Sequence, residues 1–203
     1  MKKILVDVLL FILMILEFSR MYLSPLIHEI IGILLIILVI LHLILNKSYF
    51  KNIFKGKYNL KRVVMLGVNI LFLITFILSI TFGILSSTEL LPQLNISNLR
   101  IIYLHKIFAY ISLLCMSIHL GINFNFMFRF IDNISNKIVV NIIKLVIIII
   151  GIYSFIKVDF INHMIGKYGF SIVTGNIFIN IIEYLSIVMS ITIITNIIYK
   201  KIK

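Results

Sequence analysis

The sequence predicts an all-α, polytopic membrane protein: a transmembrane helical bundle with a four-helix core plus two additional C-terminal helices. Of its 203 residues, 62% are hydrophobic and only 13% are charged, about half the charge share of a soluble domain. Apolar stretches near 20 residues recur, and each is long enough to cross ~30 Å of hydrocarbon as a helix. These stretches are continuous rather than alternating, which excludes a transmembrane barrel.

Six membrane spans are expected along the chain, at 4–19, 25–46, 62–86, 99–123, 138–156 and 171–199. The first resembles a signal peptide, but Glu17 and Arg20 follow it where small residues would mark a cleavage site. We therefore expect it to remain as a helix. Pro25 is well placed to begin the second span. The loops are too short for a soluble domain, so the chain divides into a four-helix domain at 1–130 and two further helices at 131–203.

The distribution of basic residues predicts the orientation. With the N-terminus in the cytoplasm, the inner segments carry 13 Lys and Arg residues and the outer segments carry 5. The outer ones are Arg20, Arg100, Lys106, Lys157 and Lys167. Inner segments of membrane proteins are enriched in Lys and Arg, so a multi-pass protein of the bacterial cytoplasmic membrane with both termini cytoplasmic is expected. The same distribution accounts for the net charge of +12 without a nucleic-acid partner.

Two spans carry a repeat. HEIIGILLIILVILHLILN begins at His28, and HKIFAYISLLCMSIHLGIN begins at His105, 77 positions later. Each copy has a histidine, a small residue four positions on (Gly32 or Ala109), a second histidine after 14 positions, and then an asparagine. Fourteen residues turn ~1400°, so both histidines of a copy share nearly one helix face, ~21 Å apart along the axis.

This repeat predicts two levels of paired imidazoles. The two spans are separated by one crossing and therefore run in the same direction, which puts His28 level with His105 and His42 level with His119. Haem iron takes one axial ligand on each side of its plane, and helix bundles build cofactor sites from facing side chains. We therefore expect the four histidines to be iron ligands of two haems, with Gly32 and Ala109 leaving room beside them. No Cys-x-x-Cys-His occurs, so the haems would be non-covalent b-type.

The repeat resembles the ligand helices of di-haem b-type membrane cytochromes, a group similar to the cytochrome b subunits of formate dehydrogenases and hydrogenases. The closest resemblance is to a small bacterial four-helix family of unassigned function that is associated with flavin-bearing proteins. It covers residues 1–130 and includes Asp7 and the Thr-Phe-Gly that begins at Thr81. The resemblance implies an electron-transfer subunit of an oxidoreductase, with an extracytoplasmic flavoprotein as acceptor. Quinol or a cytoplasmic-side protein would be the donor.

Further residues are candidates around these sites. Haem propionates are anionic, and arginine binds carboxylates in a bidentate manner. The arginines expected to meet them are Arg20 and Arg100 at the outer level and Arg62 and Arg129 at the inner level, with Lys106 and Lys47 as weaker candidates. Glu17 and Glu183 are candidates for proton movement at a quinone site. His163 has no repeat partner and is expected to be a surface or interface histidine.

Two other functions remain open at this point. A histidine-based metal or proton transporter would need a polar path, whereas the middle of both histidine spans is almost purely aliphatic. Two separated pairs of histidines also suit zinc poorly, since zinc prefers close tetrahedral ligand sets. A haem-free membrane scaffold would leave the equal histidine spacing as coincidence.

Overall fold

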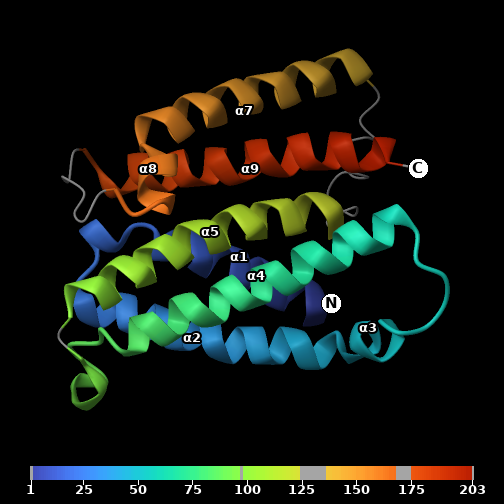
Figure 1. The fold of residues 1–203 in the computed structure, drawn as a ribbon. Helices are drawn as coiled ribbons and strands as arrows, with labels where there is room; N and C mark the ends of the chain where they lie inside the picture. Colours follow the sequence, from blue (N-terminus) through green and yellow to red (C-terminus); the bar gives the residue numbers. More distant parts are fainter. Residues whose placement is uncertain (1, 97, 124–135, 168–174, 203) are drawn as a thin grey trace.

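The structure, a computed structural model, describes residues 2–96, 98–123, 136–167 and 175–202. The described residues form helices and connecting segments, without a β-strand. The predicted all-α class is therefore confirmed. Figure 1 shows that the N- and C-termini lie at the same end of the bundle, as two termini on one side of a membrane would.

The first hairpin consists of α1 (Lys2–Glu17) and α2 (Pro25–Leu45), joined through the short helix η1 (Arg20–Tyr22). Ser24 caps α2, since its hydroxyl accepts a hydrogen bond from the Ile27 amide at 3.3 Å. Proline then occupies the first helical position, where its missing N–H costs nothing. The predicted helix start at Pro25 is thus confirmed.

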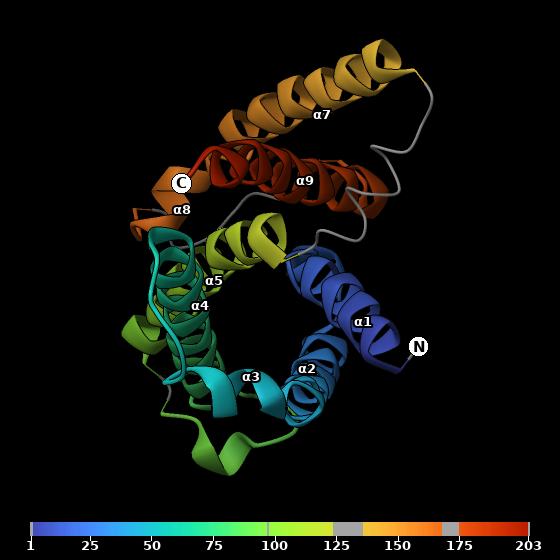
Figure 2. The ribbon, with the colours of Figure 1, turned by 90° about the vertical axis from the view of Figure 1, so that its right-hand side faces the viewer.

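The second hairpin consists of α4 (Leu60–Ile84) and α5 (Leu99–Asn123). The short helix α3 (Lys47–Asn52) leads from α2 into it, and η2 (Pro92–Leu94) lies in the loop between α4 and α5. Asn59 caps α4 by accepting a hydrogen bond from the Arg62 amide at 3.0 Å. In Figure 2 the two hairpins stand on opposite sides of one bundle, with α1 and α2 facing α4 and α5.

The C-terminal part forms a separate layer, made of α7 (Lys137–Lys157), α8 (Phe160–Met164) and α9 (Ile177–Lys201). Figure 2 shows α9 between α7 and α5. Three fully buried apolar side chains, Leu113, Ile187 and Val188, belong to α5 and α9. Helix α9 therefore covers the back of α5, α7 packs on the far side of α9, and α4 packs along α5 within its own hairpin.

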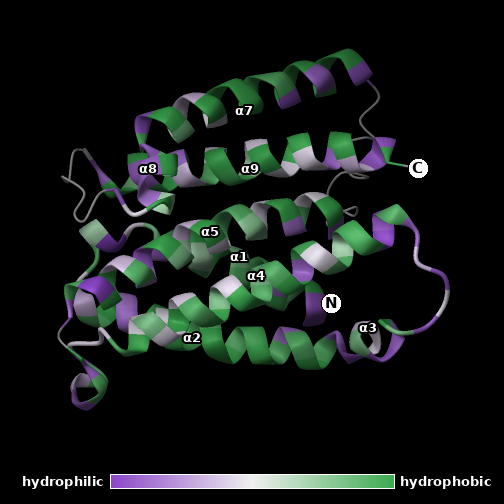
Figure 3. Ribbon diagram, in the orientation of Figure 1, coloured by the Kyte–Doolittle hydropathy of each residue, from purple (hydrophilic) through white to green (hydrophobic). Residues whose placement is uncertain are grey.

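Among the described residues, five helices are long and apolar enough to cross a membrane: α2, α4, α5, α7 and α9. α1 has 16 residues and spans roughly 24 Å, less than the ~30 Å of a hydrocarbon core. The prediction of a multi-pass membrane protein is confirmed, but of the six expected spans the first does not reach the length of a full crossing. Figure 3 shows apolar residues along the helices and polar residues gathered near their ends.

The helices differ in how much lipid-facing surface they present. Only 6% of the most apolar stretch of α2 is buried, against 33% for α5 and for α9. Large aliphatic side chains such as Ile37, Ile40 and Ile44 on α2 are more than half exposed. An apolar surface of this extent in a soluble protein would aggregate. We conclude that α2 contacts lipid along most of its length and that α5 is the central helix.

Close packing of the C-terminal layer depends on Gly151 of α7. A Cβ added there would overlap the backbone oxygen of Ser186 and the side chain of Ser190 on α9. We therefore expect Gly151→Ala to destabilise the fold by about 1–3 kcal/mol, the usual cost of overpacking, measured as unfolding in detergent. Gly67→Ala is the matched control, because nothing lies within 4 Å of its added Cβ. Equal stability of the two variants would contradict this packing.

Candidate cofactor site

The four repeated histidines lie at two levels between the hairpins. The ring centres of His28 and His105 are 6.1 Å apart, with the ring planes at 78°. His42 and His119 lie 14 residues further along the same two helices. The structure thus brings His28 and His105 together, as the parallel direction of α2 and α5 predicts.

Helix α1 supplies an acidic partner for each histidine of α2. The Nδ1 atom of His42 lies 2.7 Å from Oδ1 of Asp7, at hydrogen-bond distance. The Nδ1 atom of His28 lies 2.5 Å from Oε2 of Glu17, a close contact whose angle is not that of an aligned hydrogen bond. Glu17, which the sequence offered as a proton carrier at a quinone site, is therefore a direct neighbour of a candidate ligand.

Helix α4 supplies a neutral partner for each histidine of α5. The Nδ1 atom of His119 lies 2.8 Å from Oδ1 of Asn69, and Nδ1 of His105 lies 2.8 Å from the backbone oxygen of Ser79. With hydrogen on Nδ1, each of these rings donates to its partner. The partner on one ring nitrogen selects which nitrogen remains available to a metal. All four rings are therefore arranged to offer Nε2.

The partners extend the internal repeat from single helices to whole hairpins. Asn69 and Ser79 lie 62 positions after Asp7 and Glu17, so both pairs have the same ten-residue spacing. Sequence reasoning noticed Asp7 only through the resemblance and missed Asn69 and Ser79. The signal that was available for Asn69 is a polar side chain in an otherwise apolar span; the Ser79 contact is made by a backbone oxygen and has no such signal.

Small residues lie beside the histidines. A Cβ added to Gly32 would meet only Oε1 of Glu17, at 3.9 Å, so the space beside this residue is open. A Cβ added to Gly83 on α4 would lie 3.1 Å from two atoms of the His105 ring. Gly83 therefore lets the imidazole lie against α4, a role that the sequence did not reveal. Ala109 is half-buried on α5, one turn after His105.

The repeated asparagines act within their own helices. The side-chain nitrogen of Asn46 donates to the backbone oxygen of His42 at 2.9 Å, and that of Asn123 donates to the backbone oxygen of His119 at 2.9 Å. The asparagine side chain thus adds a donor to a carbonyl in the last turn of its helix; the His42 oxygen also accepts the Asn46 backbone N–H at 3.0 Å. The shared asparagine of the repeat is a helix-end feature beside the inner histidines.

These donors fit haem. A ligating imidazole nitrogen lies about 2 Å from its metal, so two imidazoles on opposite sides of one iron have ring centres roughly 6 Å apart. The outer pair, at 6.1 Å, has that spacing. Two imidazole nitrogens at each level are the number that a six-coordinate b-type haem would require. The open space beside Gly32 is consistent with a flat group at the outer level.

The expected outer propionate partners lie at the exposed end of the bundle. Arg20 is exposed, donates to the Leu23 backbone oxygen at 3.1 Å, and lies within electrostatic reach of His105. Arg100 is exposed at the start of α5. Lys106 is half-buried on the same helix. Arg20 and Arg100 are thus both exposed, whereas Lys106 is partly covered.

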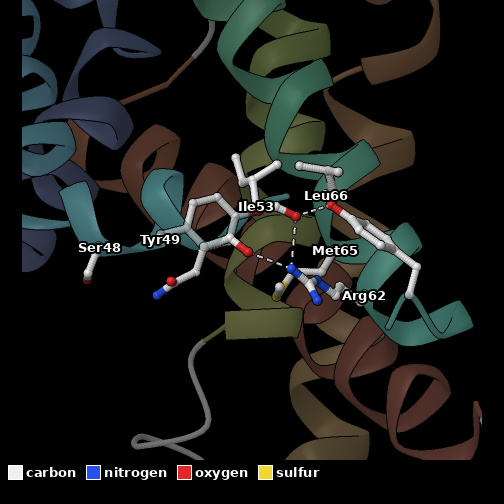
Figure 4. Close-up of a pocket in the computed structure, with 8 residues that line it drawn as sticks. Ser48, Tyr49, Ile53, Arg62, Met65 and Leu66 are labelled. Atoms are coloured by element: carbon white, nitrogen blue, oxygen red, sulfur yellow. Dashed lines mark hydrogen bonds between the residues drawn. The ribbon is translucent and has the colours of Figure 1, made fainter. Parts of the chain in front are cut away.

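The inner arginines have different surroundings. Arg62 donates to the backbone oxygens of Asn52 and Ile53 at 2.6 and 2.9 Å and lies over the ring of Tyr58. Figure 4 shows this guanidinium engaged with the loop between α3 and α4. Its donors are thus used to close the loop rather than left for an anion. Lys47 is exposed at the start of α3, and Arg129 lies outside the described residues.

A pocket of about 320 Å³ opens beside Arg62, between α3 and α4. Its lining includes Tyr49, Met65 and Leu66 (Figure 4). The hydroxyl of Tyr49 accepts a hydrogen bond at 2.8 Å from Asn69, the residue that also contacts His119. One side of the pocket is thereby connected to the inner histidine level through two hydrogen bonds.

Two further carboxylates, Glu29 and Glu183, have structural roles. The carboxylate of Glu29 accepts hydrogen bonds from the Ser87 hydroxyl and from the backbone amides of Thr88 and Leu90, at 2.7 to 2.8 Å, and so holds the loop after α4. Glu183 forms an ion pair with Lys157 at 2.5 Å. This pairing is an alternative to the proton-carrying role considered for Glu183.

His163 lies in α8 and is stacked against Tyr110, with ring centres 5.0 Å apart. Its relative exposure is 7%, so the expectation of a surface position is wrong: α8 folds back against α5 instead of facing water. Burial, with a smaller effect of Lys106, lowers the pKa of His163. Of the two positions expected for His163, surface or interface, the structure thus shows an interface between α8 and α5.

No protein-family model matches the chain, and no curated protein or solved structure matches it. Within the described residues, no group of three or more His, Cys, Asp and Glu side chains is arranged to hold a metal ion. A bis-histidine haem needs only two such side chains at each level. The site thus defines a class, a membrane helix bundle with two levels of facing imidazoles.

Proposed function

We propose that this chain is a b-type membrane cytochrome that binds two bis-histidine haems and carries electrons across the bacterial cytoplasmic membrane. His28 and His105 would hold the outer haem, and His42 and His119 the inner one. The observation that carries the proposal is the arrangement of these four imidazoles, each with Nδ1 against a partner on a neighbouring helix. A bound haem supplies a one-electron iron couple; the protein supplies ligands, orientation and low polarity.

The residues of the chain would perform three tasks. The histidines bind iron through Nε2, while Asp7, Glu17, Asn69 and the Ser79 carbonyl fix the direction of the rings. The aliphatic residues between the two levels, over ~21 Å of helix, exclude water. Helix α9 packs on the back of α5, and α7 packs on α9, which supports the ligand helix. No acid, base or nucleophile of its own is needed, so we infer an electron-transfer subunit of an oxidoreductase rather than a self-contained enzyme.

The partners follow from where the two levels lie. With the N-terminus inside, the outer haem is within reach of an extracytoplasmic acceptor, and the resemblance favours a flavoprotein. The donor would be a membrane quinol or a cytoplasmic-side protein. The pocket lined by Tyr49, Met65 and Leu66 supports a quinol, because aromatic and apolar walls with a few polar groups are typical of small-molecule sites. Its link through Asn69 to His119 adds to this support.

The stoichiometry of haem tests the proposal. Protein produced with ample haem is expected to contain two haems per chain by pyridine haemochrome assay, with the sharp visible bands of reduced six-coordinate b haem. Metal analysis of the same sample is the control for the transporter alternative, which predicts bound zinc or another cation without haem. A haem content of zero would refute the cytochrome assignment.

A further inference from the structure

The two histidines of each level have partners of different charge. On α2, His28 and His42 face the carboxylates of Glu17 and Asp7. On α5, His105 and His119 face a backbone carbonyl and the Asn69 amide. Each expected haem would therefore have one imidazole ligand beside a carboxylate and one beside a neutral acceptor, although both hairpins carry the same histidine spacing.

We propose that Glu17 and Asp7 set the reduction potentials of the outer and the inner haem, and that they do so by holding a negative charge against the Nδ1 side of one axial histidine at each level. This inference rests on the proposed function. It assigns to the two acidic residues of α1 a role in poising electron transfer, in place of the proton-carrying role considered for Glu17.

The physical basis is the charge difference between the two iron states. Oxidised haem iron carries one positive charge more than reduced iron, so a nearby carboxylate favours the oxidised state. Where the imidazole also donates to the carboxylate, as His42 does to Asp7 at 2.7 Å, it becomes a more basic ligand. Hydrogen bonds to an ionised acceptor are roughly twice as strong as those to a neutral one. Both effects lower the potential, and neither Asn69 nor the Ser79 carbonyl produces them to the same extent.

Because the two carboxylates are buried to different extents, we expect them to lower the haem potentials by different amounts. The side chain of Glu17 is 13% exposed, whereas that of Asp7 is 35% exposed. Within the described residues, Oε1 of Glu17 accepts no hydrogen bond, while Oε2 lies against Nδ1 of His28. A charge acts more strongly where water screens it less. Glu17 is therefore expected to lower the outer potential more than Asp7 lowers the inner one.

Isosteric neutral variants test the inference. Glu17→Gln is expected to raise the potential of the outer haem, changing its oxidised-to-reduced ratio on the order of tenfold at fixed potential, which is 59 mV for one electron. Asp7→Asn is expected to raise the inner potential by less. Spectroelectrochemical titration of purified protein gives both values, and a His119→Ala background, which retains only the outer haem, assigns them. Glu183→Gln is the matched control, because this carboxylate is paired with Lys157 in the C-terminal layer.

A reciprocal variant keeps the inference testable if Glu17→Gln fails to retain the outer haem. Asn69→Asp places a carboxylate beside His119 and is expected to lower the inner potential, the opposite of Asp7→Asn. Wild-type protein without haem would defeat the proposed function. Two haems per chain with potentials that Glu17→Gln and Asn69→Asp leave unchanged would overturn this inference alone and leave the cytochrome assignment intact.

Discussion

Replacing His28 or His105 by alanine is expected to remove the outer haem and lower the haem content from two per chain to one. Replacing His42 or His119 is expected to remove the inner haem instead. The reason is that each level offers only two imidazoles, and iron in a six-coordinate b-type haem needs both. Haemochrome stoichiometry measures the loss, and the redox titration of the remaining haem identifies the level.

The pairing of the variants is the decisive part of this experiment. The 6.1 Å separation of the His28 and His105 rings predicts one shared phenotype, and His42 and His119 should share the other. His163→Ala is the control, because this buried histidine packs on Tyr110 and is not expected to bind iron. If His28→Ala and His119→Ala shared a phenotype distinct from the other pair, the assignment of the two levels would be wrong.

Thiol labelling in intact cells is expected to show the loop between α4 and α5 outside and the loop between α3 and α4 inside. The physical reason is the excess of Lys and Arg in the expected inner segments, 13 against 5. In a Cys115→Ser background, Gln93→Cys should react with a membrane-impermeant reagent in intact cells. Lys55→Cys should react only after the cells are opened. Both native side chains are exposed.

The choice of position matters for this labelling. Ser87, in the same loop as Gln93, is 5% exposed and donates to Glu29, so a cysteine there would react poorly on either side. Wild-type protein is the control for Cys115, which is 4% exposed and should not react. The reverse pattern of labelling would invert the orientation, exchange the outer and inner levels, and move the expected acceptor to the cytoplasmic side.

The sequence by itself determined the fold class, the position of most helices and the pairing of histidines into levels. Apolar runs near 20 residues have few solutions other than membrane helices, since lipid offers no hydrogen bonds to the backbone. Pro25 marked the start of α2 through its own covalent geometry. The spacing of 14 residues and the parallel direction of two spans are helix geometry, so His28 and His105 had to meet if the spans formed one bundle.

Only the tertiary structure decided what surrounds the histidines. The partner of His105 is the backbone oxygen of Ser79, and a carbonyl belongs to every residue, so no side-chain pattern marks it. Its availability depends on Gly83, whose missing Cβ lets the imidazole approach α4. Arg62 likewise fits the composition of an anion site, yet its donors close a loop. Such choices depend on which helices pack side by side and at what rotation, which contacts between distant segments determine and local sequence does not.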